Sequence, residues 1–436
     1  MTVTIGSGSG AFDVTRGERA LVVGIDRAGK GDGRSSEARL EEAVGLAEAI
    51  GIDVVGRRTF RLRSPKPATL LGKGQIEELA AAARDHDAGL LVVDAPLAPV
   101  QQKSLEEQVG TKVIDRTSLI LEIFGERAAT AEGRLQVELA HLDYQAGRLV
   151  RSWTHLERQR GGFGFLGGPG ETQIEADRRL IRDRMARIRR ELEQVKRTRS
   201  LHRERRQRAP WPVIALVGYT NAGKSTLFNR MTGGDVLAED MLFATLDPTM
   251  RDVKLPGFDK AILSDTVGFV SDLPTELVAA FRATLEEVAS ADLLVHVRDI
   301  AHPDREAQRE DVERVLAQLG VGAEEEGAPP KIEAWNKVDL LAPQDREQVL
   351  AEAARRENVV PVSALTGIGI DALRERLAEA LHSGAQLHSI SLPSSDGGKI
   401  AWLHSRGDVI DQQSHDSEIV LQVRLSPENW ARFQSL

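Results

Sequence analysis

Residues 218–226 carry the clearest chemistry in this 436-residue sequence and read GYTNAGKST. They follow the apolar run PVIALV and lead into a helical pattern, which is the setting that a GxxxxGK[ST] phosphate-binding loop requires. Glycines let backbone N–H groups curl around phosphates, and the helix N-terminus adds partial positive charge. Lys224 is predicted to bridge the β- and γ-phosphates, and the Ser225 hydroxyl to bind Mg²⁺. The other predicted nucleotide contacts here are Gly218, Tyr219, Thr220, Asn221, Ala222, Gly223 and Thr226.

The identity of the base is indicated by residues 336–339, Asn-Lys-Val-Asp, at the end of the apolar run IEAWN. A carboxylate at Asp339 can accept hydrogen bonds from both N1–H and the 2-amino group of guanine, whereas adenine offers neither there. A helix-capping Asn or Asp would explain this string in isolation, but poorly where it comes two strands after a DxxG motif. The string therefore predicts a guanine nucleotide. The residues expected to contact the base are Asn336, Lys337, Asp339, Ser363, Ala364 and Leu365, the last three offering a backbone N–H to guanine O6.

A third motif, Asp265-Thr-Val-Gly268, ends the apolar run AILS. Asp265 is predicted to bind Mg²⁺ through water, and the Gly268 N–H to contact the γ-phosphate. Upstream, Thr245 in the string FATL is predicted to complete the Mg²⁺ shell only with triphosphate bound, and Thr249 is a weaker candidate. Segments that the γ-phosphate holds and hydrolysis releases make a two-state switch.

The position after this motif, where many small GTPases place a water-orienting Gln, is Phe269. Phenylalanine can neither accept nor donate a hydrogen bond, so intrinsic hydrolysis of GTP to GDP and phosphate should be slow unless a partner or an ion supplies the function. Asn221 resembles the loop Asn of GTPases that bind K⁺ beside the phosphates, although a loop-stabilising role fits it equally. The predicted cofactors are thus Mg²⁺ and, as an open alternative, K⁺. The predicted catalytic residues are Asn221, Lys224, Thr245, Asp265 and Gly268.

The elements that must position these residues define an α/β fold in four parts. Residues 1–128 alternate strand and helix patterns, with strands at 20–26, 52–60, 90–94 and 111–115, which predicts a small parallel-sheet α/β domain. Residues 210–383 return to that alternation as a P-loop GTPase domain. Residues 388–436 form a small α+β domain without evident chemistry.

Residues 129–209 show two apolar seams with a spacing near 3.5, which predicts an antiparallel coiled-coil hairpin. The seams consist of Leu135, Leu139, Leu142, Ala146, Leu149, Trp153 and Leu156, then Ile174, Ile181, Met185, Ile188, Leu192 and Val195. The glycine-rich string at 161–171 is predicted as the tip loop, and Thr172 with Glu175 as a capping box that starts the second helix.

Composition limits the function classes further. The chain has no cysteine, which excludes disulfides, cysteine-ligated zinc, Fe–S clusters and thiol catalysis. It has no signal-peptide pattern and no apolar run long enough to span a bilayer, so a soluble cytoplasmic protein is expected. A net charge of −9 argues against general nucleic-acid binding, yet residues 178–208 form a strongly basic block.

Taken together, GYTNAGKST, LFATLDPT, DTVGFV, LPTELVAAFRATLEE and NKVD resemble the HflX family of the Obg–HflX group of GTPases. Upstream, DRTSLILEIFGERAAT, EGRLQVELAHLDY and RGGFGFLGGPGETQIEADRR resemble the same family, so that residues 20–383 are covered. The resemblance implies a cytoplasmic factor that binds the large ribosomal subunit. It further implies separation of stalled or idle ribosomes into subunits, with GTP hydrolysis linked to release. We expect a monomer that binds GTP and GDP.

The hairpin suits that function because a basic stem with a Gly- and Phe-rich tip can enter an RNA cavity. The candidate RNA contacts are Phe163, Phe165, Arg178 and Arg179. Alternatively, the tip folds back and the arginine face is merely solvated. A different class of function is a GTP-dependent switch acting on a non-ribosomal partner such as a protease regulator. An ATP-driven RNA helicase would need an adenine selectivity that NKVD contradicts. Residues 72–74, Gly-Lys-Gly, are a weak candidate for a second nucleotide site, and an ordinary left-handed turn is the stronger interpretation.

Overall fold

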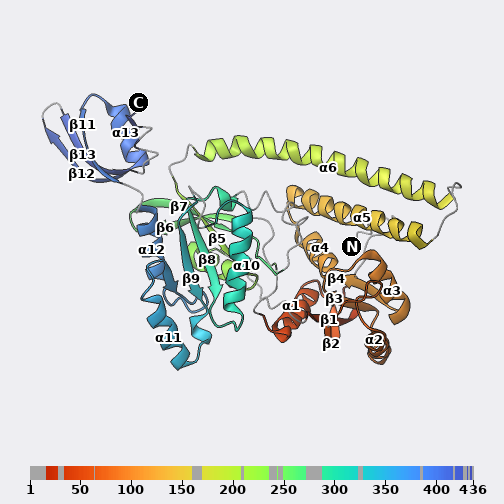
Figure 1. Ribbon diagram of the computed structural model, residues 1–436. Helices are drawn as coiled ribbons and strands as arrows, with labels where there is room; N and C mark the ends of the chain where they lie inside the picture. The colour runs from red at the N-terminus through yellow and green to blue at the C-terminus, as the bar shows by residue number, and fades with distance from the viewer. Residues whose placement is uncertain are drawn as a thin grey trace. The chain divides into compact units, whose positions relative to one another are not determined.

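The structure is a computed structural model, drawn as a ribbon in Figure 1. It describes residues 16–27, 34–62, 64–159, 169–207, 211–234, 243, 249–271, 287–322, 328–382, 386–415, 418–425, 430 and 433–434. Contacts divide the chain into two compact units, and each is considered by itself. The first unit comprises Met1–Lys196 with 240–247 and 272–282, and the second comprises the rest.

The first unit contains the predicted parallel sheet, in the order β2-β1-β3-β4. Its strands are β1 (Arg19–Arg27), β2 (Asp53–Leu62), β3 (Leu90–Asp94) and β4 (Lys112–Asp115). Its helices are α1 (Ser36–Glu48), α2 (Lys73–Asp85), α3 (Pro99–Val109) and α4 (Arg116–Arg127). Every residue of β3 is buried, as expected for a short apolar run in a sheet covered on both faces.

Two long helices follow, α5 (Ala131–Gln159) and α6 (Pro169–Gln207), which lie side by side in Figure 1. Met185, Ile188 and Leu192 of the predicted α6 seam are buried. Arg184 of α6 donates to both carboxylate oxygens of Glu138 on α5, at 2.7 and 2.9 Å. These contacts agree with a packed helical hairpin.

Two details of the hairpin differ from expectation. On the part of α5 whose side chains the structure describes, 131–148, the buried apolar residues are Val137 and Ala140, because this helix also packs against α3 and α4 of the sheet domain. The capping box at Thr172 is wrong, since α6 already begins at Pro169, and proline is well suited to a first helical position. Residues 161–168 of the predicted tip lie outside the described residues.

The second unit is built on the sheet β10-β9-β8-β5-β7-β6, parallel except for β6. Its strands are β5 (Val213–Gly218), β6 (Thr249–Leu255), β7 (Phe258–Asp265), β8 (Leu293–Asp299), β9 (Lys331–Asn336) and β10 (Val359–Pro361). Its helices are α7 (Lys224–Thr232), α10 (Arg305–Gln318), the short 3₁₀ helix η1 (Val338–Leu340), α11 (Pro343–Ala353) and α12 (Ile370–His382).

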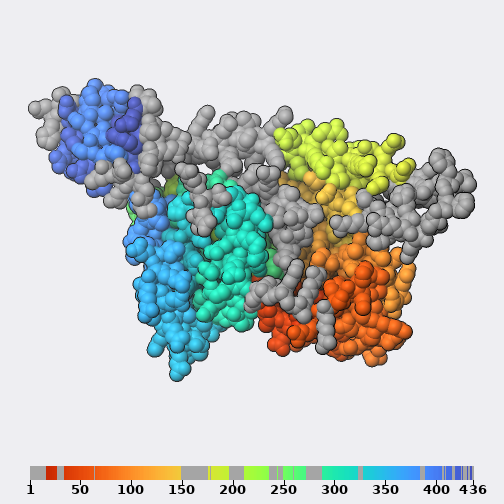
Figure 2. Space-filling view, in the orientation of Figure 1, coloured from red at the N-terminus to blue at the C-terminus, as the bar shows by residue number. Residues whose placement is uncertain are grey.

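Side-chain alternation along the strands sorts these helices onto the two faces of the sheet. Residues of α7 and α12 share one core with the apolar residues of β5 and β8. Trp335 on the opposite face of β9 packs with α11. In the space-filling view, residues from β8 to α12 appear as one continuous teal-to-blue surface (Figure 2). The carboxyl ends of β5, β7, β8 and β9 therefore meet at one edge, which is where the predicted motifs lie.

A separate small sheet ends the chain, in the antiparallel order β11-β13-β12. It consists of β11 (Gln386–Pro393), β12 (Asp408–His415) and β13 (Glu418–Leu425), with α13 (Gly397–Arg406) packed on it through Leu403. Sequence analysis missed β6 and β12. Both are edge strands rich in polar and charged residues, so their patterns give little hydrophobic signal. Among the described helices, none is long and apolar enough to cross a membrane.

Candidate functional site

The phosphate loop connects β5 to α7 and holds Lys224 in a fixed pose. The Lys224 ammonium donates to the backbone carbonyls of Gly218 and Tyr219, at 3.1 and 2.8 Å. Burial lowers the pKa of Lys224 to about 8, and the charge of Asp265 offsets part of that effect. A buried cation held mainly by neutral carbonyls gains from an anion beside it, so the loop favours phosphate.

Asn336 joins the phosphate loop to the predicted base-binding segments. Its side-chain amide donates to the Ala222 carbonyl at 2.8 Å, and its oxygen accepts from the Ala364 N–H at 2.9 Å. Gly223 has a left-handed backbone (φ +91°), and a Cβ there would lie 2.2 Å from the Asn336 amide nitrogen. Only glycine fits at this point of the loop.

The predicted metal ligands Ser225 and Asp265 meet at the start of α7. The Ser225 hydroxyl donates to an Asp265 carboxylate oxygen at 2.7 Å, and Asp265 is fully buried. A hydroxyl and a carboxylate are hard oxygen donors of the kind that Mg²⁺ prefers, so this pair fits the predicted ion. Thr245 lies outside the described residues. Thr249, the weaker candidate, is the first residue of β6 and pairs with Asp265 across the sheet.

The segment after Asp265 is fastened to the phosphate loop. The Phe269 N–H donates to the Gly218 carbonyl at 3.1 Å, and the Thr220 N–H donates to the Phe269 carbonyl at 2.7 Å. A Cβ at Gly268 would lie 2.8 Å from the Thr220 methyl carbon, so this glycine passes close against the loop. The Phe269 side chain is 1% exposed and packs into the domain. The ring therefore does not occupy the position from which a water-orienting side chain would act.

The base-binding segments lie at the ends of β9 and β10. Lys337 adopts a left-handed conformation, and its ammonium contacts the Asp299 carboxylate at 2.8 Å. Asp339 is half-buried in η1. Ser363 and Ala364 are buried, whereas Leu365 is 70% exposed.

Of the predicted nucleotide residues, the structure brings most to one edge of the sheet, in the unit that contains β5–β10. Those are Gly218, Tyr219, Thr220, Asn221, Ala222, Gly223, Lys224, Ser225, Thr226, Asp265, Gly268, Asn336, Lys337, Asp339, Ser363, Ala364 and Leu365. Tyr219 is buried, and its hydroxyl accepts from the Ser271 N–H at 2.8 Å. Asn221 is exposed with φ +57°, a conformation that asparagine tolerates better than most residues.

Two residues at this edge escaped the sequence analysis. Asp299 ends β8 and fixes the Lys337 ammonium, and its place after a buried apolar strand was a usable signal. Arg230 of α7 donates through Nε to the Ala364 carbonyl at 3.0 Å and through Nη2 to the Leu365 carbonyl. No sequence signal indicates Arg230, since its partners lie more than 130 residues away.

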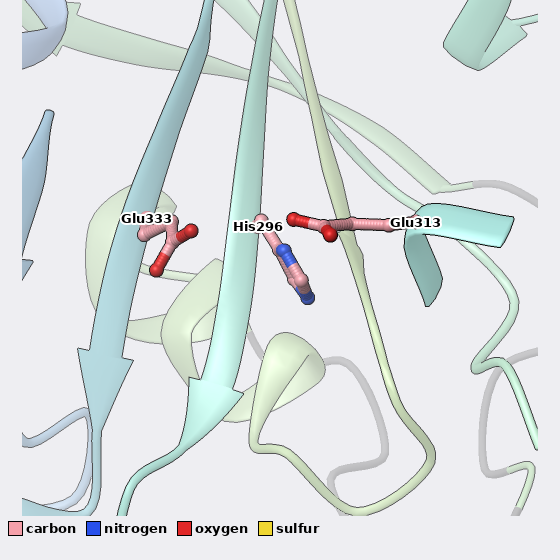
Figure 3. Close-up of side chains that lie close together, drawn as sticks. All are labelled: His296, Glu313 and Glu333. Carbon is pink, nitrogen blue, oxygen red and sulfur yellow. The ribbon is translucent and has the colours of Figure 1, made fainter. Parts of the chain in front are cut away.

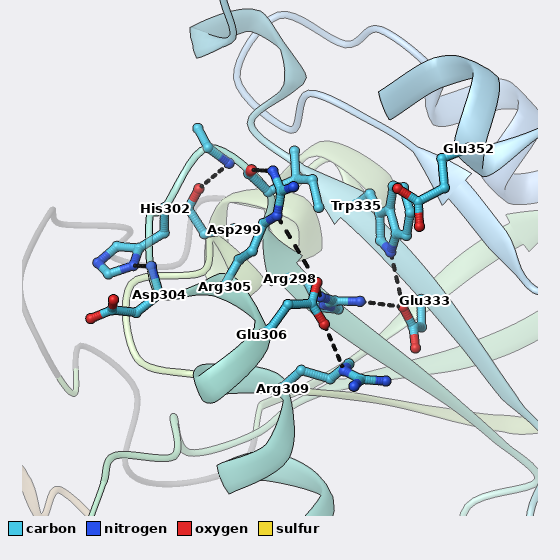
Figure 4. Close-up of polar contacts among 12 residues, drawn as sticks. Arg298, Asp299, His302, Asp304, Arg305, Glu306, Arg309, Glu333, Trp335 and Glu352 are labelled. Carbon is cyan, nitrogen blue, oxygen red and sulfur yellow. Dashed lines mark hydrogen bonds and ion pairs between the residues drawn. The ribbon is translucent and has the colours of Figure 1, made fainter. Parts of the chain in front are cut away.

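An ionic network centred on the buried Arg298 supports the end of β8 that carries Asp299 (Figure 4). Arg298 donates to Glu333 at 2.8 Å and to Glu306 at 2.7 Å, and the Trp335 indole donates to Glu333 at 2.9 Å. Burial by itself raises the pKa of Glu333, but hydrogen bonds from Trp335 and Arg298 bring that pKa below its ordinary value. The carboxylate therefore stays ionised and paired.

A second cluster, His296, Glu313 and Glu333, brings its potential ligand atoms within 4.8 Å of one another (Figure 3). Burial lowers the pKa of His296 to about 3, so its imidazole is neutral. Both carboxylates already have cations, because Glu313 contacts Lys331 at 3.2 Å and Glu333 contacts Arg298. A divalent ion would add charge beside these two cations, so we assign this cluster no metal.

Residues 72–74 form an ordinary helix start. The Gly72 N–H donates to the Gln75 side chain at 2.9 Å, and the exposed Lys73 ammonium lies 3.8 Å from Glu77. The expected left-handed turn is wrong for this glycine, whose φ is −77°; Leu70 (φ +61°) is the left-handed residue of this connection.

Of the predicted RNA contacts, Arg178 is half-buried and Arg179 exposed on α6. Phe163 and Phe165 lie outside the described residues.

Family models match the chain along most of its length. Residues 37–125 match the N-terminal region and 127–206 the middle region of GTP-binding GTPases. Residues 213–337 match the family described as 50S ribosome-binding GTPase, and 348–434 the HflX C-terminal domain.

Curated relatives named GTPase HflX are similar over nearly the whole chain. The relative from Magnetococcus marinus is 48% identical over 395 residues, which cover 91% of this chain and 90% of that protein. The Caldanaerobacter subterraneus relative is 41% identical, covering 94% and 92%. The Escherichia coli relative is 42% identical, covering 90% and 91%.

Proposed function

Because this chain belongs to the HflX family of GTPases, we propose that it couples GTP hydrolysis to binding and separation of ribosomal subunits. The protein is a GTPase, as its relatives and its matched GTPase domain indicate. The partner we propose is the large ribosomal subunit, in the cytoplasm. This proposal is supported by the description of the family that residues 213–337 match, 50S ribosome-binding GTPase.

The main support for the proposed nucleotide site is the position of the Lys224 side chain. Its buried ammonium is held at the mouth of the phosphate loop, beside the paired Ser225 and Asp265. In our proposal Lys224 contacts the phosphates, and Ser225 and Asp265 hold Mg²⁺, which would neutralise charge on the transferred phosphoryl group. Asn336 and Asp339 recognise guanine.

The burial of Phe269 supports slow intrinsic hydrolysis, because this residue stands where other GTPases place a water-orienting Gln and its buried ring forms no hydrogen bond to water. The missing function has two proposed sources. One is K⁺ held beside the exposed Asn221, and the other is a group of the ribosome itself.

The arginine-rich face of α6 supports contact with ribosomal RNA. Exposed arginines on the described part of this helix are Arg179, Arg182, Arg187, Arg189 and Arg190. Each can meet a phosphate, so binding should weaken steeply with added salt.

The test is GTP turnover with and without purified large subunits, in potassium and in sodium buffer. Strong stimulation by subunits is the expected result, and dependence on potassium would assign Asn221 its ion. A rate of GTP turnover that is unchanged by large subunits would favour the second candidate, a GTP-dependent switch acting on a non-ribosomal protein.

The tip is tested separately with the double variant Phe163→Ala and Phe165→Ala. We expect weaker binding to large subunits with unchanged basal turnover. The matched control is Phe433→Ala in the C-terminal domain. Equal subunit affinity of the tip variant and the wild type would mean that the tip does not contact RNA.

A further inference from the structure

Arg230 projects from the last turn of α7 onto the loop at 363–366, which is the proposed guanine-binding loop. Its Nε donates to the Ala364 carbonyl at 3.0 Å, and its Nη2 donates to the Leu365 carbonyl. A planar guanidinium that binds two successive carbonyls fixes the orientation of both peptide groups.

The backbone N–H groups of this loop differ in whether they already have an acceptor. The Ala364 N–H donates to Asn336 at 2.9 Å, the Thr366 N–H to the Ser363 hydroxyl at 3.1 Å, and the Gly367 N–H to the Ser363 carbonyl at 2.8 Å. Within the part of the chain that the structure describes, no acceptor is found for the Leu365 N–H. This N–H is therefore available to a ligand.

The peptide geometry indicates where that N–H points. The peptide bond between Ala364 and Leu365 is trans, so its carbonyl and its N–H face opposite sides. Arg230 holds the carbonyl side, and the N–H faces away from it. The hydrogen bond from Gly367 back to Ser363 closes a single helical turn, in which successive N–H groups point the same way. The Leu365 N–H therefore points as the Ala364 N–H does, toward Asn336 and the base-binding edge.

We infer that Arg230 is a positioning residue for guanine selectivity. By holding the carbonyls of Ala364 and Leu365, it keeps the Leu365 N–H directed at the keto oxygen O6 of guanine. A charged donor on the carbonyl also polarises the same peptide group and strengthens its N–H as a donor. Adenine carries an amino group in place of O6, and two donors would face each other. This inference rests on the proposed nucleotide site.

A neighbouring arginine provides a matched control. Arg374 of α12 donates to the Met231 carbonyl at 3.3 Å and contacts Asp371 at 3.1 Å. It therefore fastens the same end of α7 without touching the loop at 363–366. Replacing Arg374 shows how loosening the end of α7 changes nucleotide affinity. Replacing Arg230 loosens that end and also removes the contacts to the loop at 363–366.

The experiment measures the dissociation constants of three diphosphates with the full chain, in the wild type, Arg230→Ala and Arg374→Ala. The ligands are GDP, 6-thio-GDP, whose sulfur is a poor acceptor in place of O6, and IDP, which lacks only the 2-amino group. We expect Arg230→Ala to weaken GDP and IDP each about tenfold, equivalent to about 1.4 kcal/mol, and 6-thio-GDP only about twofold. Arg374→Ala should change none of the three by more than about twofold.

Two results would overturn the inference. Equal weakening of all three ligands by Arg230→Ala would show a general structural role, and no weakening would show no role. Arg230→Gln, which keeps hydrogen-bond donors without the charge, replaces the alanine variant if that variant fails to fold. Its dissociation constant for GDP should lie between that of the wild type and the roughly tenfold higher value expected for Arg230→Ala. A wild type that binds ADP as tightly as GDP would instead refute the guanine site itself, whatever Arg230 does.

Discussion

The N-terminal sheet and the GTPase sheet share parallel α/β architecture, but the carboxyl edges of their strands are occupied differently. In the N-terminal sheet, Arg116 is buried between the carboxylates of Asp94 and Glu42. In the GTPase sheet, Lys224 is equally buried but is held by two backbone carbonyls. At the edge of the N-terminal sheet the cation is paired with carboxylates of the protein. At the edge of the GTPase sheet the cation can pair with an anionic ligand.

The carboxylates at the two edges show the same contrast. Asp115 accepts hydrogen bonds from the Leu97 N–H at 3.0 Å and from the Ser118 N–H and the Tyr144 hydroxyl at 2.8 Å each. Asp265 instead accepts from Ser225, a predicted metal ligand. The comparison teaches that this topology alone does not make a ligand site; unbalanced buried charge at the edge does.

The sharpest test of the comparison is the stability of Arg116→Ala. It leaves Asp94 buried without its cation, while Glu42 keeps Arg34 at 3.0 Å, so the unfolding free energy of the N-terminal domain should fall by about 3 kcal/mol. Lys224→Ala removes a desolvated charge but also takes the nearby cation from Asp265, so the two effects oppose and the unfolding free energy of the empty protein should change by less than about 1 kcal/mol. Chemical unfolding without nucleotide measures both. Equal losses in the two variants would remove the distinction between the edges.

Nucleotide affinity should show the opposite order. Lys224→Ala removes the proposed partner of the phosphates, and we expect GDP to bind roughly 10²–10³-fold more weakly. Lys73→Ala, in the Gly-Lys-Gly string, is the matched control and should change affinity for GDP and for ATP by less than about twofold. Isothermal titration measures both variants. A loss of ATP binding in Lys73→Ala would reveal a second nucleotide site in the N-terminal domain.

The pKa of Lys224 predicts how affinity depends on pH. The ammonium has a pKa of about 8 in the empty site, and bound phosphate raises that pKa, so binding takes up a proton above pH 8. The affinity for GDP should therefore fall with rising pH, by about sixfold between pH 7.0 and 8.8. Lys224→Arg, which stays charged, should flatten the profile. A flat wild-type profile would mean that Lys224 remains protonated in the empty site.

The smallest expected effect concerns His296, the buried neutral group behind the site. Burial holds its folded pKa near 3, below the ordinary value of 6.5, so its contribution to stability is complete above pH 6.5 and is lost as pH falls toward 3. We expect about 1 kcal/mol of lost unfolding free energy between pH 6.5 and 5.5, absent in His296→Gln. Intrinsic tryptophan fluorescence, to which the buried Trp335 contributes, follows the unfolding transition, with His404→Gln as surface control. Identical acid profiles in the three proteins would exclude this role.

The sequence alone determined the features whose cause is local. The strands β3, β5, β8 and β9 are short apolar runs that could be predicted directly, and the strings GYTNAGKST, DTVG and NKVD place their chemistry on contiguous residues. Because the carboxyl ends of parallel strands meet at one edge, the proximity of Lys224, Asp265 and Asn336 could also be predicted.

Only the tertiary structure shows the strands and side-chain roles that depend on residues far away in the sequence. The edge strands β6 and β12 carry polar residues and form because a neighbouring strand offers hydrogen bonds. Arg230 acquires its role from two carbonyls on a loop more than 130 residues away, and Phe269 is taken out of the site by packing and by backbone pairing with Gly218. These features follow from long-range contacts, to which a local pattern of residue types is blind.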